Sequence, residues 1–542
     1  MQRVDRESSP LEVNQRLSRS LLWQLQRNYF ERHGIEAWSS GSVPHHITSS
    51  PFIADAYARV VMGFLRDWSM DQHSETVLDD RQPVYIVELG SGSGRFAFSF
   101  LKKFLSLQRS SVLKDIPIKY VMTDFTKSNL DYLRMHPWLS PFIKEGLLDF
   151  ARFDLESDNQ FELLDSGETL ANATLRNPLI VISNYVFDST RQDAFLAANK
   201  NLFEIRVSLT ATQNEIDTAD PSILSKIDIS AHKKPISGNY YEDAKWNRVL
   251  HDCKQRFTDT TFLFPTAALQ CIRNLHQLSS GRMMLLSGDR GHNDNDLKVA
   301  GAIPTFALHG SFSMMVDFQI IGDYCQQLGG QVLHPARQTE NLNISAFLFG
   351  DPAVDFIETR QAYAEAIEKF GPDDFFTLKE AVSRGYNSLT PDEMLTFLRL
   401  SCWDHKRFRE CLPALKNHLS NLTSLQKQHL YEAILKVWDS YLPIGEENDL
   451  AFELGTLLLE IEFHQEALEF LQRSVDLYGM SPGAAYNIAV CYYGLNQMDH
   501  ALDYLNQAMS LDQEFTEARD LYSEVQSALL NATRRLRRKR RA

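Results

Sequence analysis

The sequence predicts a doubly wound α/β domain followed by an all-helical domain. Between residues 84 and 350, short apolar runs alternate with helical patterns, as in a parallel sheet with helices on both faces. The run 84–87 leads directly into the glycine-rich segment ELGSGSGR, residues 88–95. Beyond residue 351 strand signals fade and helical patterns dominate. The 542 residues exceed one ordinary core, so at least two domains are expected.

Residues 1–80 are expected to form N-terminal helices that pack on the α/β domain. Apolar residues at helical spacing predict helices over 11–32 and 52–68. The polar, aperiodic stretch 208–264 predicts an insertion over the edge of the sheet, where loops often shape a substrate site. The α/β domain is expected over 81–350, with strands at 84–89, 118–124, 147–154, 179–183 and 282–287. Its expected helices are 96–107, 127–135 and 267–278. The segments 306–318 and 345–349 are expected to close the sheet.

The helical domain, expected over 351–531, contains an internal repeat. Four positions, Gly455, Leu458, Ala467 and Leu471, recur 34 residues later as Ala489, Tyr492, Ala501 and Leu505. Small and aromatic residues at this period resemble the tetratricopeptide (TPR) repeat. Degenerate helical hairpins are expected upstream over 392–400 with 406–415 and over 424–441, and a capping helix is expected over 514–530.

The composition limits the classes of function. The formal net charge of −15 opposes nonspecific binding to nucleic acid. The six cysteines form no CxxC pair and no zinc spacing with histidine, so no metal is expected. No apolar run reaches the roughly 18 residues that cross a bilayer, so we expect a cytoplasmic protein without a membrane partner. The basic tail, 532–542, has no interleaved aromatic residues and is expected to be a solvated, disordered end rather than a specific nucleic-acid site.

The glycine-rich segment predicts a site for a nucleotide-type cofactor. A dinucleotide fingerprint counted from Gly90 needs glycine where this chain has Arg95. The segment instead reads ExGxGxG, which resembles motif I of class I S-adenosylmethionine (SAM) dependent methyltransferases. A flexible Gly/Ser loop is the alternative, but a strand pattern and a helix pattern flank the segment closely. The residues expected to hold the cofactor here are Glu88, Gly90, Ser91, Gly92 and Gly94.

Two further acids end the next strands. Asp124 is expected to accept both ribose hydroxyls, with Phe125 packing on the adenine, and Asp154 is the candidate for the adenine amino group. A lone Asp at a strand end is more often a cap or a turn former. Three acids in successive βα units, counting Glu88, favour a binding function.

Asn184 and Asp188, in the segment ISNYVFDSTRQDAF, are the candidate catalytic residues. An amide and a carboxylate at the carboxyl edge of the sheet can hold a guanidinium or amine acceptor, and the carboxylate can accept its proton. Methyl transfer is a direct displacement, so geometry matters more than a strong base. Asn184 could equally cap the next helix, with Asp188 in a turn, and the local sequence does not separate these readings. The run GDRGHNDND, residues 288–296, is interpreted as a solvent loop, although it could border the acceptor channel.

Four segments, in this order along the chain, resemble the MidA-like methyltransferases. They are ITSSPFIADAYARVV, VELGSGSGRF, YVMTDFTKSNLDYL and SNYVFDSTRQDAF. That family includes a mitochondrial complex I assembly factor that methylates a protein arginine. The resemblance spans roughly residues 40–350 and implies that Glu88 and the glycines cradle the methionine part of SAM, with Asn184 and Asp188 on the acceptor side. The chain departs from the family at Met315, where a histidine is usual, and at Phe52, where the family has an acid.

Two readings of the whole chain follow. In the first, it is a SAM-dependent methyltransferase whose TPR-like domain recruits a protein substrate or partner. In the second, it is an interaction scaffold that binds SAM but transfers methyl groups weakly. A small-molecule acceptor is a third option, disfavoured because it needs no docking surface. The sequence does not define the oligomeric state or the acceptor.

Overall fold

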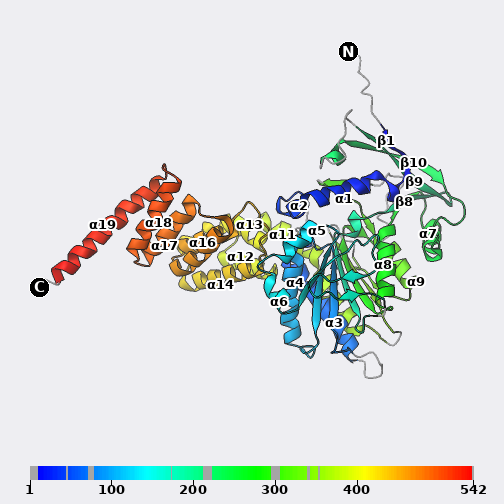
Figure 1. The fold of residues 1–542 in the computed structure, drawn as a ribbon, viewed down its shortest axis with the longest axis horizontal. Coiled ribbons are helices and arrows are strands. Elements are labelled where there is room, and N and C mark those ends of the chain that lie inside the picture. Colours follow the sequence, from blue (N-terminus) through cyan, green and yellow to red (C-terminus); the bar gives the residue numbers. More distant parts are fainter. Residues whose placement is uncertain are drawn as a thin grey trace, which may run out of the picture. The chain divides into compact units, whose positions relative to one another are not determined.

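The computed structural model describes residues 10–43, 47–70, 78–172, 174–211, 222–293, 305–309, 311–337, 342–351 and 354–539, with only the backbone described for 532–539. The chain divides into two compact units, 1–379 and 380–542. The first unit is a mixed α/β structure and the second is helical, as Figure 1 shows. This confirms the predicted α/β and helical composition.

The first unit is built on a seven-stranded sheet with the order β17-β18-β12-β7-β2-β3-β4. All neighbouring pairs are parallel except those made by β18, which is antiparallel to both β12 and β17. From β2 the chain first adds strands on one side and then returns to add β7 on the other. The bounds are β2 (Val84–Leu89), β3 (Ile118–Asp124), β4 (Leu148–Arg152), β7 (Leu179–Asn184), β12 (Met283–Asp289), β17 (Gln331–Leu333) and β18 (Asn343–Phe349).

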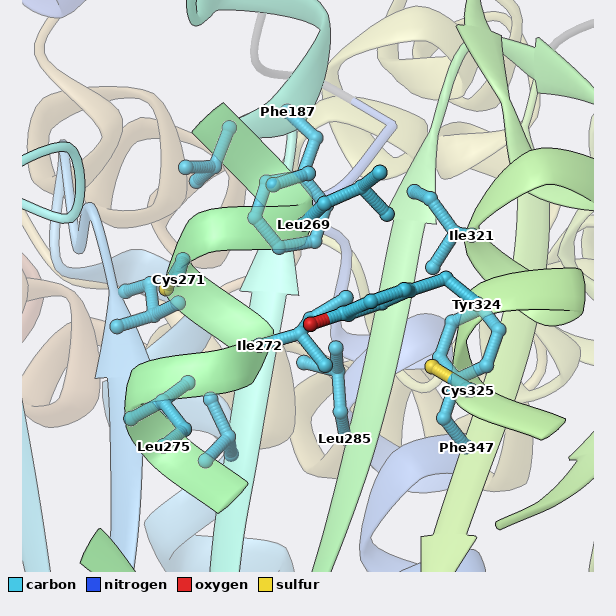
Figure 2. Close-up of a cluster of buried hydrophobic side chains, with 14 of the residues drawn as sticks. Phe187, Leu269, Cys271, Ile272, Leu275, Leu285, Ile321, Tyr324, Cys325 and Phe347 are labelled. Atoms are coloured by element: carbon cyan, nitrogen blue, oxygen red, sulfur yellow. The ribbon is translucent and has the colours of Figure 1, made fainter. Parts of the chain in front are cut away.

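Helices cover both faces of this sheet. On one face, α8 (Thr266–Leu278) and α9 (Phe318–Gln327) pack on alternate strand residues, and Figure 2 shows Leu269, Tyr324 and Phe347 in this buried cluster. On the other face, α4 (Arg95–Arg109) packs on β3, where the rings of Phe100 and Tyr120 lie 5.4 Å apart. Two more helices, α3 (Pro51–Met70) and α10 (Ile357–Tyr363), extend that layer, and α5 (Lys127–Arg134) follows β3.

The expected helix over 11–32 is wrong in its first part. Residues Pro10–Arg16 form strand β1, and α1 begins only at Leu21, where the Ser20 hydroxyl accepts the backbone N–H of Leu22 as a cap. The strand forms because β1 pairs antiparallel with β9, and the guanidinium of Arg16 forms an ion pair with buried Asp193. These partners are distant in sequence, so local periodicity could not reveal them. A short helix, α2 (Glu36–Ser39), follows α1 (Leu21–His33).

The stretch 208–264 lies between β7 and β12 in the chain, but it is not aperiodic where the structure describes it. It belongs to a second, antiparallel sheet in which β9 pairs with β1, β8 and β10. β10 pairs with β9 along its whole length, and its alternating apolar residues Ile227, Ile229 and Ala231 pack on the core of this sheet while the side chains between them are exposed. The elements are β8 (Asp193–Ala198), β9 (Asn201–Ala211), β10 (Ile227–Pro235), α7 (Ala244–Arg256) and β11 (Thr260–Phe264).

The expectation that 306–318 closes the main sheet is also wrong. The described residues of this segment form the short strands β14 (Ala307–His309), β15 (Ser311–Ser313) and β16 (Val316–Asp317), and Phe318 begins α9. They form two-stranded pairings outside the main sheet, β14 with β15 and β13 (Gly291–His292) with β16. Closure comes instead from β17 and β18, whose buried apolar residues continue the core.

The first unit extends beyond the expected boundary at residue 350. The carboxylate of Asp67 on α3 accepts the backbone N–H groups of Glu358 and Thr359 at 2.9 and 2.8 Å, so it holds the start of α10. The ring of Phe356 stacks on Phe64 at 5.8 Å. These contacts place the segment from 354 in the first unit, which ends at Lys379 within α11 (Pro372–Ser383).

The second unit consists of helical hairpins. Successive helices α15 to α18 pack in sequence order, and the Cα of Gly455 approaches the side chain of Leu471 so closely that a Cβ would lie 2.9 Å from Cγ. The backbone of the basic tail is helical through residue 539 rather than disordered, since no Gly or Pro interrupts the sequence from Thr516 onward. The helices are α12 (Pro391–Leu400), α13 (His405–Lys416), α14 (Ser424–Ser440), α15 (Leu450–Glu460), α16 (His464–Tyr478), α17 (Pro482–Gly494), α18 (Met498–Leu511) and α19 (Thr516–Lys539).

Candidate functional site

A cavity opens in the first unit at the carboxyl ends of β2 and β7. These strands are neighbours at the point where the strand order reverses, which is where open α/β sheets usually bind ligands. Nine of the ten sequence-predicted site residues line it, and α1, α2 and the end of β12 contribute as well. The predicted residues at the cavity are Glu88, Gly90, Ser91, Gly92, Asp124, Phe125, Asp154, Asn184 and Asp188.

The glycine turn after β2 depends on all three of its glycines. Gly90, Gly92 and Gly94 have φ angles of 63°, 50° and 72°, a region that residues with a Cβ rarely adopt. A Cβ on Gly90 would lie 3.0 Å from Val186, and one on Gly92 would lie 3.1 Å from the indole of Trp38. Gly94 does not line the cavity; it precedes α4 as its N-cap. The turn therefore brings bare backbone to the cavity wall.

Glu88 ends β2 as a buried carboxyl group beneath this turn. It is 3% exposed, and its Oε2 has no hydrogen-bond partner among the described residues. Burial raises the pKa of Glu88 to about 8, although the nearby hydroxyls of Ser91 and Tyr120 act in the opposite direction. A carboxyl group in this state is available to a ligand that brings a donor or a positive charge.

Asp124, at the end of β3, is already held by the protein. Its Oδ1 accepts the backbone N–H and the hydroxyl of Thr126 at 2.9 and 2.8 Å, and its Oδ2 accepts the amide of Asn129 at 2.9 Å. The same amide donates to the carbonyl oxygen of Gly92 at 2.8 Å. Burial raises the pKa of Asp124, and these donors oppose that shift. Asp124 thus ties the β3–α5 turn to the glycine turn, and its role toward a ribose stays a prediction.

Phe125 and Asp154 are both engaged by an arginine that the sequence reading did not identify. The guanidinium of Arg27 on α1 pairs with Asp154 Oδ2 at 2.8 Å and lies 4.5 Å from the centre of the Phe125 ring. Phe30 of the same helix packs edge-on to Phe125 at 6.5 Å. An arginine within an amphipathic helix carries no local signal of such a role, because the contact depends on how α1 crosses the sheet edge.

Asn184 and Asp188 lie on either side of the turn after β7. The hydroxyl of Tyr57 on α3 donates to Asn184 Oδ1 at 2.7 Å, and Asn184 Nδ2 has no partner among the described residues. The short helix Phe187–Ser189 has no side-chain cap, so Asn184 does not serve as one. Asp188 is 4% exposed and accepts the hydroxyl of Ser189 at 2.8 Å. Burial raises the pKa of Asp188 to about 6, against the favourable charge of nearby Arg290.

The end of β12 lies against Asp188, and the residue after it, Arg290, lines this part of the cavity. Asp289 is fully buried, and its Oδ1 accepts the backbone N–H of Asp188 in a long bond of 3.4 Å. Burial and the neighbouring Asp188 raise the pKa of Asp289 well above its usual range. Arg290 lines the cavity, and Tyr185 adopts a φ of 52°, which is unusual for a residue with a side chain. The interpretation of 288–296 as a solvent loop is therefore wrong for its first residues, and 294–296 lie outside the described residues.

Among the described residues, no group of three or more histidine, cysteine, aspartate or glutamate side chains is arranged to hold a metal ion. None of the described helices combines the length and apolar character that a membrane span requires.

Comparisons with known proteins give partial similarities. No family model matches the chain. Intraflagellar transport protein 70A of Danio rerio is 40% identical over 60 residues, which cover 11% of this chain and only 9% of that protein.

Several solved structures share features of the chain at low identity. A COG1565 superfamily protein from Burkholderia thailandensis is 13% identical, with 63% of this chain and 89% of that chain covered and a TM-score of 0.38. A COG1565 superfamily member from the same organism, bound to S-adenosyl-homocysteine, is 14% identical, with 64% and 90% covered and a TM-score of 0.39. MamA from Desulfovibrio magneticus RS-1 is 19% identical, with 30% and 96% covered and a TM-score of 0.22.

Proposed function

We propose that the first unit binds SAM and transfers its methyl group to a side chain of another protein, which the helical unit recruits. By the family resemblance the acceptor is an arginine. The observation that carries this proposal is the glycine turn: two of its three left-handed glycines, Gly90 and Gly92, present bare backbone to a cavity at the reversal point of the sheet, which is also lined by Glu88, whose Oε2 has no partner among the described residues.

The residues present fit the parts of SAM. Glu88 Oε2 is a buried acceptor without a donor among the described residues, which suits the positively charged amino group of the methionine part. Gly90 and Gly92 are held so close to Val186 and Trp38 that only bare backbone fits, and this backbone faces the cavity. Phe125 offers an aromatic face and Asp154 a carboxylate for the adenine, provided that Arg27 releases them.

The acceptor side would rest on Asn184 and Asp188. Bound SAM supplies an electrophilic methyl group on its sulfonium. Asn184 can fix the approach of the acceptor by hydrogen bonding, which contributes most to a direct displacement. Asp188, with a pKa of about 6, is largely ionised at neutral pH and can take the proton that the methylated nitrogen releases.

The recruiting role of the helical unit is supported by its hairpin construction. Stacked helix pairs, such as α15 with α16 and α17 with α18, offer an extended surface that suits peptides or helices. The 34-residue recurrence coincides with these hairpins, because Gly455 and Ala489 occupy the first helix of each and Ala467 and Ala501 the second.

The proposal is tested in two stages with the full-length protein. Calorimetry with SAM and with S-adenosylhomocysteine should detect binding, and the variant Gly90→Val should abolish it while the circular dichroism spectrum stays unchanged. Incubation with methyl-labelled SAM and a cell lysate, followed by mass spectrometry, should then locate the label on a protein side chain. Absence of SAM binding by the wild-type protein would reject the cofactor assignment.

A scaffold function is the second candidate, and one observation favours it. The guanidinium of Arg27 covers one face of Phe125 and pairs with Asp154, while the indole of Trp38 packs on Gly92. If α1 and α2 kept these contacts permanently, the cavity would be too obstructed for turnover. Tight SAM binding without any label transfer, together with retained capture of a partner, would favour this candidate.

A further inference from the structure

A tyrosine on α3 makes the hydrogen bond that orients Asn184. Tyr57 is fully buried, and its Oη lies 2.7 Å from Asn184 Oδ1. The ring of Tyr57 packs edge-on to Phe96 at 5.4 Å, so its position is fixed from the side of α4. Burial and the nearby Asp289 raise the pKa of Tyr57 well above its usual range, so the hydroxyl stays protonated and remains a donor.

Counting donors and acceptors fixes which way the amide points. With Oδ1 toward the tyrosine, the Tyr57 hydroxyl has its acceptor, and only the NH2 group of Asn184 is left without a partner among the described residues. With the amide flipped, the NH2 group would donate to Tyr57 Oη, and two groups would then be unsatisfied, the Tyr57 O–H and Asn184 Oδ1. Each unsatisfied buried polar group costs about 1–3 kcal/mol, so the first orientation is favoured.

The end of β12 is shaped around this bond. Gly288 lies opposite Asn184 in the parallel pairing of β7 with β12. A Cβ at Gly288 would overlap Tyr57 Oη and would lie 2.8 Å from Asn184 Oδ1. Glycine is therefore required here by close approach, since the backbone of Gly288 does not adopt a left-handed conformation.

We propose that Tyr57 is a positioning residue for methyl transfer: its hydroxyl holds Asn184 Oδ1 and leaves the Asn184 NH2 group as a donor for the reacting partners. This inference rests on the proposed function, because Asn184 is assigned to the acceptor side. Tyr57 itself does not line the cavity, so it acts through Asn184 and not by touching substrate.

The test compares four full-length variants with the wild type. Tyr57→Phe removes the hydroxyl and keeps the ring, Asn184→Ala removes the amide, and the double variant removes both. Tyr363→Phe is the matched control, because the hydroxyl of buried Tyr363 on α10 also makes one short hydrogen bond, 2.6 Å to the carbonyl of Ile344, and Tyr363 does not line the cavity. The readouts are S-adenosylhomocysteine affinity by calorimetry and the initial rate of label transfer from methyl-labelled SAM to proteins of a cell lysate.

The expected result is a transfer rate at least about tenfold lower in Tyr57→Phe, with cofactor affinity within about twofold of the wild type. The double variant should be no slower than Asn184→Ala alone, because both changes remove one function. Tyr363→Phe should transfer at the wild-type rate. A wild-type rate in Tyr57→Phe, or a double variant in which the two losses multiply, would overturn the inference and leave the proposed function intact. Cofactor binding without transfer by the wild type would reject the proposed function and this inference together.

Discussion

Replacing Glu88 by glutamine is expected to stabilise the ligand-free protein by an amount that grows with pH. The Glu88 carboxyl group is buried beneath the glycine turn, and burial raises its pKa from 4.5 to about 8. Glutamine has nearly the same shape and carries no charge, so it removes the cost of ionising this group in the core.

The sign and size of the effect follow from proton linkage. Because the folded state holds the Glu88 proton more tightly than the unfolded state, unfolding free energy is lost as the pH rises from 4.5 to about 8 and is constant above that. At about 1.36 kcal/mol per pH unit, Glu88→Gln should gain nothing near pH 4.5, roughly 2 kcal/mol at pH 6 and on the order of 5 kcal/mol at pH 8.

The assay is urea unfolding of wild type and variant at pH 5, 6, 7 and 8, since the difference between them cancels the titration of every other group. Glu162→Gln, at an exposed position of the same unit, serves as the control and should show no such trend. The variant should also bind SAM more weakly, because the ligand's amino group loses its carboxylate. Parallel loss of stability in wild type and Glu88→Gln across this range would refute the reasoning, because Glu88 would then titrate near its ordinary pKa.

Three further outcomes are expected. Gly92→Val should abolish SAM binding in calorimetry with little change in the circular dichroism spectrum, since its Cβ would meet Trp38 at 3.1 Å and its φ would be strained; wild-type affinity would contradict the cofactor assignment. Asp188→Asn should slow transfer about a hundredfold at unchanged SAM affinity, and the wild-type rate should fall below about pH 6 as Asp188 is protonated; a flat profile would exclude it as the proton acceptor. A chain ending at Ser383, after α11, should bind SAM in calorimetry and fail to capture the partner in pull-down assays; retained capture would place recruitment in the first unit.

Short-range patterns were sufficient for most strands of the main sheet, although not for β17, and for the hairpins of the helical unit. The run before Glu88 is a buried parallel strand, which reads as a continuous apolar segment. In the second sheet, apolar and polar residues of β9 do alternate from Phe203 to Ala211, whereas β1 has no comparable run. For β1, residue Val13 is 70% exposed, and pairing with residues near 207 decides its structure rather than its own sequence.

The residues of the candidate site also fall into two groups, those that short-range sequence patterns predict and those that they do not. Glycines and acids at strand ends could be placed from sequence, because every parallel strand delivers its last residues to the same edge. Arg27, Trp38, Tyr57 and Asp289 could not, since each contacts a site residue only through the packing of one element on another. Their residue types are ordinary for an amphipathic helix or a strand end.

The pairing of β1 with β9 has a consequence for biosynthesis. Strand β1 is synthesised long before its partner, residues 201–211. At about 5–20 residues per second, roughly 10–40 s separate the synthesis of residue 16 from that of residue 211. Helix α1 lacks its native contacts for longer still, because its residue Gln26 donates a hydrogen bond to the carbonyl of Phe312 at 2.6 Å, and Phe312 is synthesised later than β9. The nascent chain therefore carries its first strand and the apolar face of α1 without their native partners through most of the translation of this unit, so these segments are where we expect a ribosome-associated chaperone to bind.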